Sequence, residues 1–287
     1  MGRSLTYNVL TLPSAAQVAA ARDHIRPFAL RTPLLRLNAD LPGVNLCLKL
    51  ENLQPWGSFK IRAALNALKT MDAAPLKRGV LTASAGNFGQ GLAFAARAMG
   101  VPATVVVPDG AAETKVKALR ELGARVIRRS FDDWWTVLTS RYCAGEEGIF
   151  VHPVAEPGRL RPLARMIAAE SEAAQPAAAA LREGGPVKVP HRRSFVDGMG
   201  STTVLTEMWP LLRAVADQAE CASFEQIAAA IRLLAGRHHV IAEAAGAVSV
   251  AAALGAQGLK GNIVCIVSGG NIDSEKLGSI LAGRSPF

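Results

Sequence analysis

The chain has 287 residues, half of them hydrophobic and 19% charged, which is enough to bury the core of two closely joined domains. Lys and Arg outnumber Asp and Glu by 32 to 23, giving a net charge of +9. The basic residues are scattered and aromatic residues make up 5%, so a partner nucleic acid is not expected, and a basic nucleic-acid binder remains a hypothesis supported by net charge alone.

The spacing of the cysteines and the length of the apolar stretches argue against further classes of protein. The four cysteines are far apart and form no CxxC pair, so the sequence predicts neither a zinc site nor a disulfide framework. They are Cys47, Cys143, Cys221 and Cys265. The N-terminal residues lack the apolar core of a signal peptide, and the most apolar stretch, 244–256, is shorter than a membrane span. We therefore expect a soluble, cytoplasmic protein with no membrane partner.

Strand and helix signals alternate along the first half of the chain. A helix is predicted over 15–26, with Ser14 as N-cap and Pro27 just past its end, and an apolar strand over 44–50. The next hundred residues predict strands at 80–83, 103–107, 125–127 and 149–151, and helices at 89–99, 114–122 and 132–142. Gly or Pro marks each boundary, which indicates an α/β fold with a parallel sheet covered by helices on both faces.

The alternation weakens after Pro153. Helices are predicted over 173–182 and 224–234, the second of them amphipathic. A buried strand over 263–267 ends in Ser268-Gly-Gly-Asn271, and a short final helix follows.

Three motifs carry the chemistry. The first is Glu51-Asn-Leu-Gln-Pro-Trp-Gly-Ser-Phe-Lys60, in which Lys60 is either a surface lysine at a helix start or a desolvated amine able to form a Schiff base. The second runs from Thr82 through Ser84-Ala-Gly-Asn87 to Gly91, after a strand, where small residues and free helix N–H groups favour an anion. The third is Ser268-Gly-Gly-Asn, at the carboxyl end of a strand, where ligands bind in α/β sheets.

In this order and spacing the motifs resemble the fold-type II pyridoxal-phosphate enzymes, within them the serine/threonine dehydratase and serine racemase family. The resemblance runs from Arg31-Thr-Pro to the C-terminal region and includes Val151-His-Pro, Ser194-Phe-Val-Asp-Gly198 and Ala242-Glu-Ala-Ala-Gly246. It implies a tryptophan synthase beta-subunit-like α/β fold of two open, twisted, mostly parallel sheets with flanking helices. Residues 51–149 would form the small domain, and residues 1–50 and 150–287 the large cofactor domain.

The resemblance also implies residue roles. Lys60 would carry the pyridoxal phosphate as a Schiff base and move the α-proton, Asn87 would bond the phenolic oxygen, and Ser268 the pyridine nitrogen. A neutral Ser there favours quick β-elimination. The implied catalytic residues are Lys60 and Ser84; the cofactor contacts are Lys60, Phe59, Asn87, Gly198, Glu243, Ser268 and Gly269; the contacts to the amino-acid substrate are Ser84, Ala85, Gly86, Asn87 and Gln90.

One segment typical of the family is missing. There, the His-Pro strand is followed by a long helix, a core strand, a glycine-rich loop that grips the cofactor phosphate, and another helix. In this chain His152-Pro is followed, after a short stretch that includes Gly158, by residues 164–170, which resemble the strand after that last helix. A strand–loop–helix unit of on the order of 30 residues is absent from the large domain. No run of three glycines occurs in the chain.

Smaller departures concern single positions. Trp56 and Ala63 stand where the family prefers a small hydroxyl residue and Gly, and Phe88 replaces the usual His. Ala85 sits where racemases place a proton-donating Ser, which favours elimination over racemisation. Glu170 resembles one ligand of the family's divalent-cation site, but Pro176 occupies the place of its acidic partner, so no metal is expected.

The leading hypothesis is a lyase of amino acid metabolism, a homodimer that deaminates serine, threonine or a related hydroxy amino acid. The alternative is a catalytically impaired pseudoenzyme that keeps the fold and binds an amino acid or a protein partner.

Overall fold

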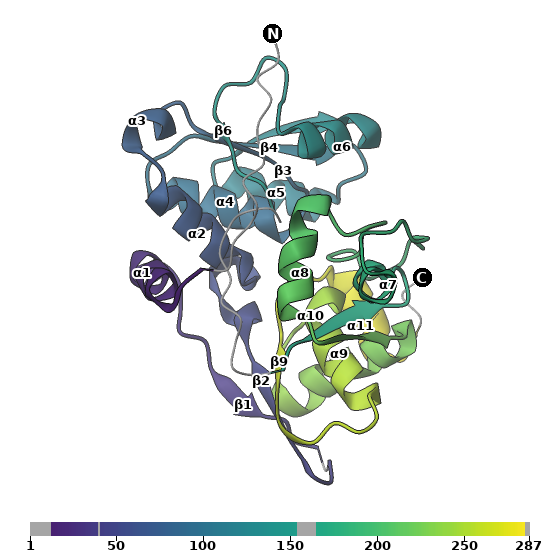
Figure 1. The fold of residues 1–287 in the computed structure, drawn as a ribbon. Helices are drawn as coiled ribbons and strands as arrows, with labels where there is room; N and C mark the ends of the chain where they lie inside the picture. The colour runs from purple at the N-terminus through teal and green to yellow at the C-terminus, as the bar shows by residue number, and fades with distance from the viewer. Residues whose placement is uncertain (1–12, 40, 154–164, 285–287) are drawn as a thin grey trace.

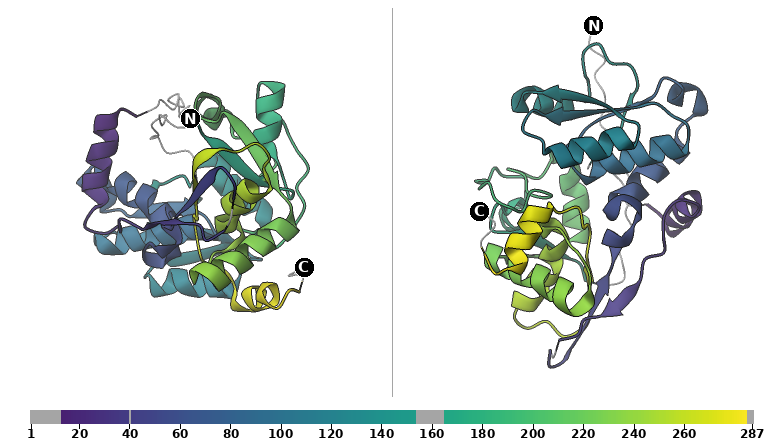
Figure 2. Two further views of the ribbon diagram at one scale, coloured as in Figure 1. Left: turned by 90° about the horizontal axis from the view of Figure 1, so that it is seen from below. Right: turned by 180° about the vertical axis from the view of Figure 1, so that it is seen from behind.

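The computed structural model describes residues 13–39, 41–153 and 165–284, and Figures 1 and 2 show its two main parts. At one end lies a four-stranded parallel sheet of order β5-β4-β3-β6. Its strands are β3 (Val80–Ala83), β4 (Ala103–Pro108), β5 (Arg125–Arg129) and β6 (Ile149–Phe150). Its helices are α2 (Lys60–Thr70), α3 (Ala73–Leu76), α4 (Asn87–Ala98), α5 (Glu113–Glu121) and α6 (Phe131–Ser140).

Both faces of this sheet are buried, as the alternation of side chains requires. Val105 and Val107 of β4 pack with α4 and α5, whereas Val106 between them packs with Val137 of α6 on the opposite face. The predicted strands and helices of this half are confirmed, with bounds shifted by one or two residues.

The other end of the molecule contains two smaller sheets. β1 (Leu34–Arg36) pairs antiparallel with β2 (Val44–Lys49), and β2 pairs in parallel with β9 (Gly261–Ile266). β7 (Ile167–Ser171) pairs in parallel with β8 (Gln218–Ala222) as a separate two-stranded sheet. The α/β fold class is confirmed, and the second of the two expected sheets is present as two pieces.

Helices of this end surround the second core. They are α7 (Pro176–Glu183), α8 (Trp209–Val215), α9 (Phe224–His238), α10 (Ala244–Gly255) and α11 (Ser274–Leu281). α10 contacts β7, β8, β9 and α9, so its small apolar side chains form the centre of this core. Within the described residues, no helix is both long and apolar enough to span a bilayer.

The N-terminal helix α1 (Ala15–Ile25) confirms the predicted helix, and Ser14 caps it through a capping box with Gln17. It lies beside α2, and Ile25 is buried in the same core as α2 and α4 (Figure 1). The remaining short elements are the 3-10 turns η1 (Glu51–Leu53), η2 (Pro55–Gly57) and η3 (Thr206–Met208).

Candidate active site

Lys60 is the first residue of α2 and lies where the two parts of the molecule meet. The segment before it is held to the end of β9, because Phe59 N–H donates to the carbonyl of Ser268 at 3.0 Å and Ser58 bridges Gly269. Lys60 Nζ is half-buried, lies 5.1 Å from the centre of the Phe59 ring and donates to the carbonyl of Pro153 at 3.4 Å.

The start of α2 is anchored by a buried carboxylate. Glu51 is 4% exposed and accepts hydrogen bonds from Arg62 Nε at 2.7 Å and Thr32 Oγ1 at 2.7 Å. Burial would raise the pKa of Glu51, but the bonds from Arg62 and Thr32 outweigh it, so the pKa is lowered. The charged carboxylate therefore fixes Arg62, one half-turn after Lys60.

The N-terminus of α4 follows β3 directly. The buried Ser84 Oγ accepts from the N–H of Gly89 at 3.2 Å and of Gly86 at 3.4 Å, so this hydroxyl shapes the turn. A Cβ at Gly89 would meet the Ser84 carbonyl at 2.5 Å, and a Cβ at Gly91 would meet Lys60 C at 3.1 Å. The small residues are thus required for close packing of α4 against both β3 and the start of α2.

Asn87 joins the two parts of the molecule by side-chain bonds. Its Nδ2 donates to Glu243 Oε1 at 2.5 Å, and its Oδ1 accepts from Asn271 Nδ2 at 2.8 Å. Glu243 is 3% exposed and is the N-cap of α10, and its own N–H donates to the carbonyl of Gly269 at 3.1 Å. Burial raises the pKa of Glu243 to about 7, although the bond from Asn87 lowers it in part.

The motif after β9 forms the floor between these residues. Ser268 Oγ lies 3.4 Å from the carbonyl of Ala245, to which it donates. A Cβ at Gly269 would come within 3.0 Å of Asn87 Nδ2 and still closer to Glu243, so any larger residue would displace these side chains. A Cβ at Gly198 would meet Ala245 Cβ at 3.0 Å and lie 3.5 Å from Glu243 Oε1, which places Gly198 at the same site.

Asn271 is the residue that sequence reasoning placed in a motif but did not select as a site residue. Its Nδ2 lies near three acceptors, at 2.9 Å from the carbonyl of Trp56, 2.8 Å from Asn87 Oδ1 and 3.4 Å from Gln90 Oε1. Trp56 has a φ of +60°, an uncommon backbone conformation for a bulky residue that is typical of strained functional turns. Asn271 therefore fixes the loop before Lys60 against the start of α4.

Two titratable groups border this cluster. Asp197 accepts from Lys115 of α5 at 3.3 Å and from Lys276 of α11 at 3.1 Å, which links the two parts of the molecule beside Gly198. His152 is 3% exposed, and its pKa is lowered to about 4 by burial and by the charges of Arg141 and Lys60. His152 is therefore neutral at pH 7.

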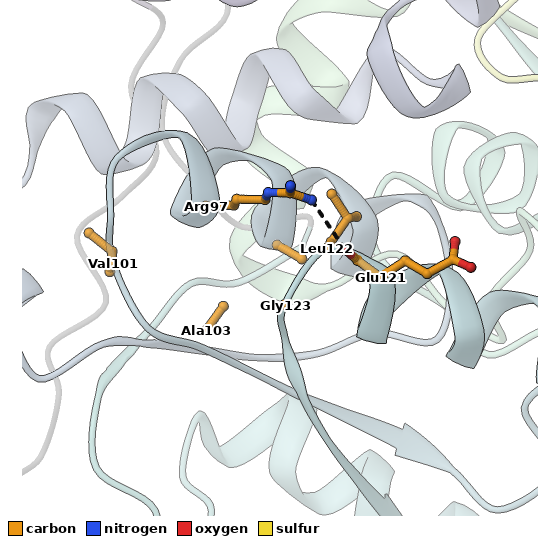
Figure 3. A pocket seen from close by; sticks show the side chains of 7 residues that line it. Arg97, Val101, Ala103, Glu121, Leu122 and Gly123 are labelled. Atoms are coloured by element: carbon orange, nitrogen blue, oxygen red, sulfur yellow. Dashed lines mark hydrogen bonds between the residues drawn. The ribbon is translucent and has the colours of Figure 1, made fainter.

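Glu170 and the cavities lie apart from this cluster. Both Glu170 oxygens accept N–H groups at the start of α7, from Ala177 and Ala178 at 2.8 Å each, and the described residues contain no cluster of three metal-ligating side chains. A cavity of about 240 Å³ lies at the amino end of β4, where Arg97 donates to the carbonyl of Glu121 (Figure 3). A second lies beside α7. Neither cavity is lined by Lys60 or its neighbours. The site is therefore defined by its residues and their hydrogen bonds.

The gathered residues fit one end of pyridoxal phosphate better than the other. A half-buried amine, an amide with a spare N–H and a neutral hydroxyl are all present. A phosphate dianion requires several converging backbone N–H groups, which a glycine-rich loop supplies. The sequence has no run of three glycines.

Comparison with known proteins gives the same assignment. The profile of the family described as "Pyridoxal-phosphate dependent enzyme" matches residues 25–161 and 151–269. The chain is 33% identical, over 321 aligned positions, to an L-threonine ammonia-lyase of Geobacter sulfurreducens, covering 93% of this chain and 79% of that protein. Its structure is similar to a threonine deaminase of T.th. (28% identity, TM-score 0.77, 91% and 99% of the two chains) and to maize serine racemase (24% identity, TM-score 0.84, 95% and 98%).

The chain therefore belongs to the pyridoxal-phosphate dependent enzyme family, and its fold is the one expected from the three motifs. The match falls into two pieces that overlap at residues 151–161, and the alignment with the Geobacter protein is longer than this whole chain. That relative thus has residues with no counterpart here, and their place along this chain stays a prediction.

Proposed function

We propose that this chain is a pyridoxal-phosphate-dependent lyase that converts a small hydroxy amino acid, serine or threonine, into a 2-oxo acid and ammonia. One observation supports this above the others. Hydrogen bonds of 2.5 to 3.1 Å connect the three distant segments that contain Lys60, Asn87 and Ser268. Phe59, next to Lys60, donates to the carbonyl of Ser268. Asn87 donates to Glu243, which in turn donates to the carbonyl of Gly269. The names of the relatives, an L-threonine ammonia-lyase and a threonine deaminase, agree with the reaction.

Lys60 would hold the cofactor through Nζ and move the α-proton. An amine performs both tasks only when it is uncharged for part of the cycle. Pyridoxal phosphate supplies the electron sink that makes the α-proton acidic. The carbonyl of Pro153 and the Phe59 ring would keep Nζ at one place while the proton moves.

Asn87 and Ser268 would orient the ring. An amide nitrogen has two N–H donors, and Glu243 uses one of them in Asn87, so the second remains for the phenolic oxygen. The Ser268 hydroxyl is neutral, and its one proton, directed at the Ala245 carbonyl at 3.4 Å, would turn to an unprotonated ring nitrogen. A neutral donor there disfavours prolonged carbanion chemistry and favours elimination.

The start of α4 would bind the substrate carboxylate. The N–H groups of a first helical turn have no acceptor within the helix and attract anions. Ser84 and Ala85 lead into this turn, Gly86 is its N-cap and Asn87 its first residue. Gln90 lies in the same turn, with 4% of its surface exposed. Ala85 has no proton to give, so racemisation is not proposed.

The test is release of 2-oxo acid from serine and threonine by the purified chain with added pyridoxal phosphate. We expect turnover that Lys60→Ala abolishes and that Lys117→Ala, at an exposed position of α5, leaves unchanged. Equal rates in the two variants, or no turnover by the unchanged chain, would remove the lyase assignment and favour the pseudoenzyme.

The cytoplasmic location and the homodimer stay predictions. Size-exclusion chromatography with light scattering tests the dimer, for which a mass near twice 30.1 kDa is expected.

A further inference from the structure

Asn271 lies where three segments of the chain meet. Its Nδ2 is 2.9 Å from the carbonyl oxygen of Trp56 and 2.8 Å from Asn87 Oδ1. Trp56 belongs to the loop before Lys60, Asn87 is the first residue of α4, and Asn271 follows β9. Trp56, Asn87 and Asn271 are partly buried, so water replaces a lost hydrogen bond between them only in part.

The carbonyl group of Trp56 determines which end of the Asn271 amide faces it. A carbonyl oxygen only accepts hydrogen bonds, whereas the two ends of an amide, a donor nitrogen and an acceptor oxygen, have nearly the same shape. If the Asn271 amide were turned over, Oδ1 would lie at this carbonyl, 2.9 Å from a second acceptor. The loop is held in place as well, because the N–H of Gly270 donates to the carbonyl of Gly57 at 2.9 Å. The direction of the Asn271 amide therefore follows from the backbone of the loop.

The Asn271 amide in turn determines the direction of the Asn87 amide. Asn271 Nδ2 donates to Asn87 Oδ1 at 2.8 Å, so Asn87 Nδ2 points to the other side. There it donates to Glu243 Oε1 at 2.5 Å. Donor and acceptor thus alternate from the Trp56 carbonyl to Glu243, and turning either amide alone would bring like atoms together.

Glu243 does not determine this direction at mildly acid pH. Its pKa is raised to about 7, chiefly by burial and also by the charge of Asp197, while the bond from Asn87 and the charge of Lys115 lower it in part. Below that pH the carboxyl group is protonated, and it then both donates and accepts. Either end of the Asn87 amide would satisfy it, so the bond from Asn271 decides which end faces Glu243.

We propose that Asn271 is a positioning residue that sets the direction of the Asn87 amide, so that Asn87 turns its N–H groups, and not its oxygen, toward Glu243. This direction needs no cofactor. Its consequence, an N–H of Asn87 available for the phenolic oxygen of pyridoxal phosphate, rests on the proposed function. Asn271 then acts on the cofactor through Asn87 and not by direct contact.

The test is Asn271→Asp, which replaces the donor nitrogen by an acceptor of nearly the same shape. The readout is the set of nuclear Overhauser contacts of the Asn87 side-chain amide hydrogens in the isotope-labelled chain without cofactor, assigned by their loss in Asn87→Ala. At about pH 5.5 Glu243 is protonated, so the new carboxylate does not face a second charge there. Asn262→Asp, which adds the same charge at an exposed position of β9, is the control.

In the unchanged chain and in Asn262→Asp, the Asn87 amide hydrogens should contact the side chain of Glu243. In Asn271→Asp we expect these contacts to fall by about half or more and contacts to position 271 to appear, because the Asn87 nitrogen turns to the new acceptor. Amide hydrogens that stay at Glu243 in Asn271→Asp, or the same loss in Asn262→Asp, would overturn the proposal.

Asn271→Ala is a second variant, which removes the donor without adding a charge. At the same pH nothing then decides between the two directions of the Asn87 amide, so its contacts to Glu243 should weaken. Contacts as strong as in the unchanged chain would overturn the proposal. Loss of the fold in both Asn271 variants would show a purely structural role and would overturn it as well.

The affinity for pyridoxal phosphate tests the consequence separately. Asn271→Asp should bind the cofactor about tenfold more weakly than Asn262→Asp, because the Asn87 oxygen would then face the phenolic oxygen. Equal affinities of the two variants would contradict this consequence. An unchanged chain that binds no pyridoxal phosphate would refute the proposed function, and the contacts of the Asn87 amide would still decide the role of Asn271.

Discussion

Glu243 is a buried carboxyl group whose protonation links the site to stability. Its pKa is raised from 4.5 to about 7: burial raises it most, the bond from Asn87 and the charge of Lys115 lower it in part, and the charge of Asp197 raises it. A raised pKa means that the folded state binds the proton more tightly than the unfolded state. This contribution to stability is complete below pH 4.5 and is lost as pH rises to about 7.

Glu243→Gln should therefore become more favourable, relative to the unchanged chain, as pH rises. The amide oxygen can still accept from Asn87, and no charge has to be buried. Between pH 4.5 and 8 we expect the difference in unfolding free energy to move in favour of the variant by about 3 kcal/mol at most. Urea unfolding at both pH values measures it, with Glu225→Gln, at an exposed position of α9, as control. A pH-independent difference would show that Glu243 is ionised in the folded protein.

Substitutions at Gly57 and Gly43 distinguish the cost of backbone strain from the cost of a steric clash. Both have a positive φ, +71° and +73°, which disfavours any side chain. A Cβ at Gly57 would also meet Asn271 Oδ1 at 2.5 Å, whereas a Cβ at Gly43 meets nothing within 4 Å. Gly57→Ala should cost about 1 to 2 kcal/mol more unfolding free energy than Gly43→Ala. Equal costs would mean that the Asn271 network moves without penalty.

The sequence predicted the single residues that carry the chemistry better than it predicted the residues to which they form hydrogen bonds. Lys60, Ser84, Asn87 and Ser268 stand in short motifs with recognisable residue types, and the structure gathers their neighbourhoods. The bond from Asn87 to Glu243 joins residues 156 positions apart, and the role of Asn271 depends on three distant acceptors. Such contacts follow from tertiary packing, which no local pattern specifies.

Helix caps carry stability at the scale of elements. Ser223 Oγ accepts from Gln226 N–H at 3.2 Å, and Gln226 Oε1 accepts from Ser223 N–H at 2.8 Å, a reciprocal cap for α9. α9 buries six residues in the second core, whereas α1, with the same cap at Ser14, buries only Ile25 among its described side chains. Ser223→Ala should cost about 1 kcal/mol in global unfolding, and Ser14→Ala clearly less. Thermal unfolding of the two variants measures both costs. A larger cost for Ser14→Ala than for Ser223→Ala would contradict this packing.

Elements with strong periodicity or clear boundaries were predictable, and others were not. β3, β4 and β9 are short apolar runs with Gly or Pro nearby, and each was predicted within two residues of its ends. β1 and β8 were missed, because β1 ends in Arg36 and β8 (Gln218–Ala222) contains Gln, Glu and two Ala. β8 becomes a strand because it pairs with β7 and packs on α10.

At the scale of the whole molecule, the predicted loss of the glycine-rich segment should change which part of the cofactor contributes to binding. The residues proposed to contact the ring and aldehyde are present, whereas the sequence has no run of three glycines for the phosphate. Pyridoxal phosphate should therefore bind no more than about tenfold more tightly than pyridoxal, a difference of about 1.4 kcal/mol. Competition titrations measure the ratio. A preference of a thousandfold or more would reveal a phosphate site elsewhere in the chain.

The central claim is that Lys60 is the residue that binds pyridoxal phosphate. The most direct measurement is borohydride reduction of the chain with saturating pyridoxal phosphate, followed by peptide mass spectrometry, beside Lys60→Ala and Lys117→Ala. The account predicts that the reduced adduct lies on Lys60, is absent from Lys60→Ala and persists in Lys117→Ala. Adducts spread over exposed lysines, unchanged in Lys60→Ala, would contradict it.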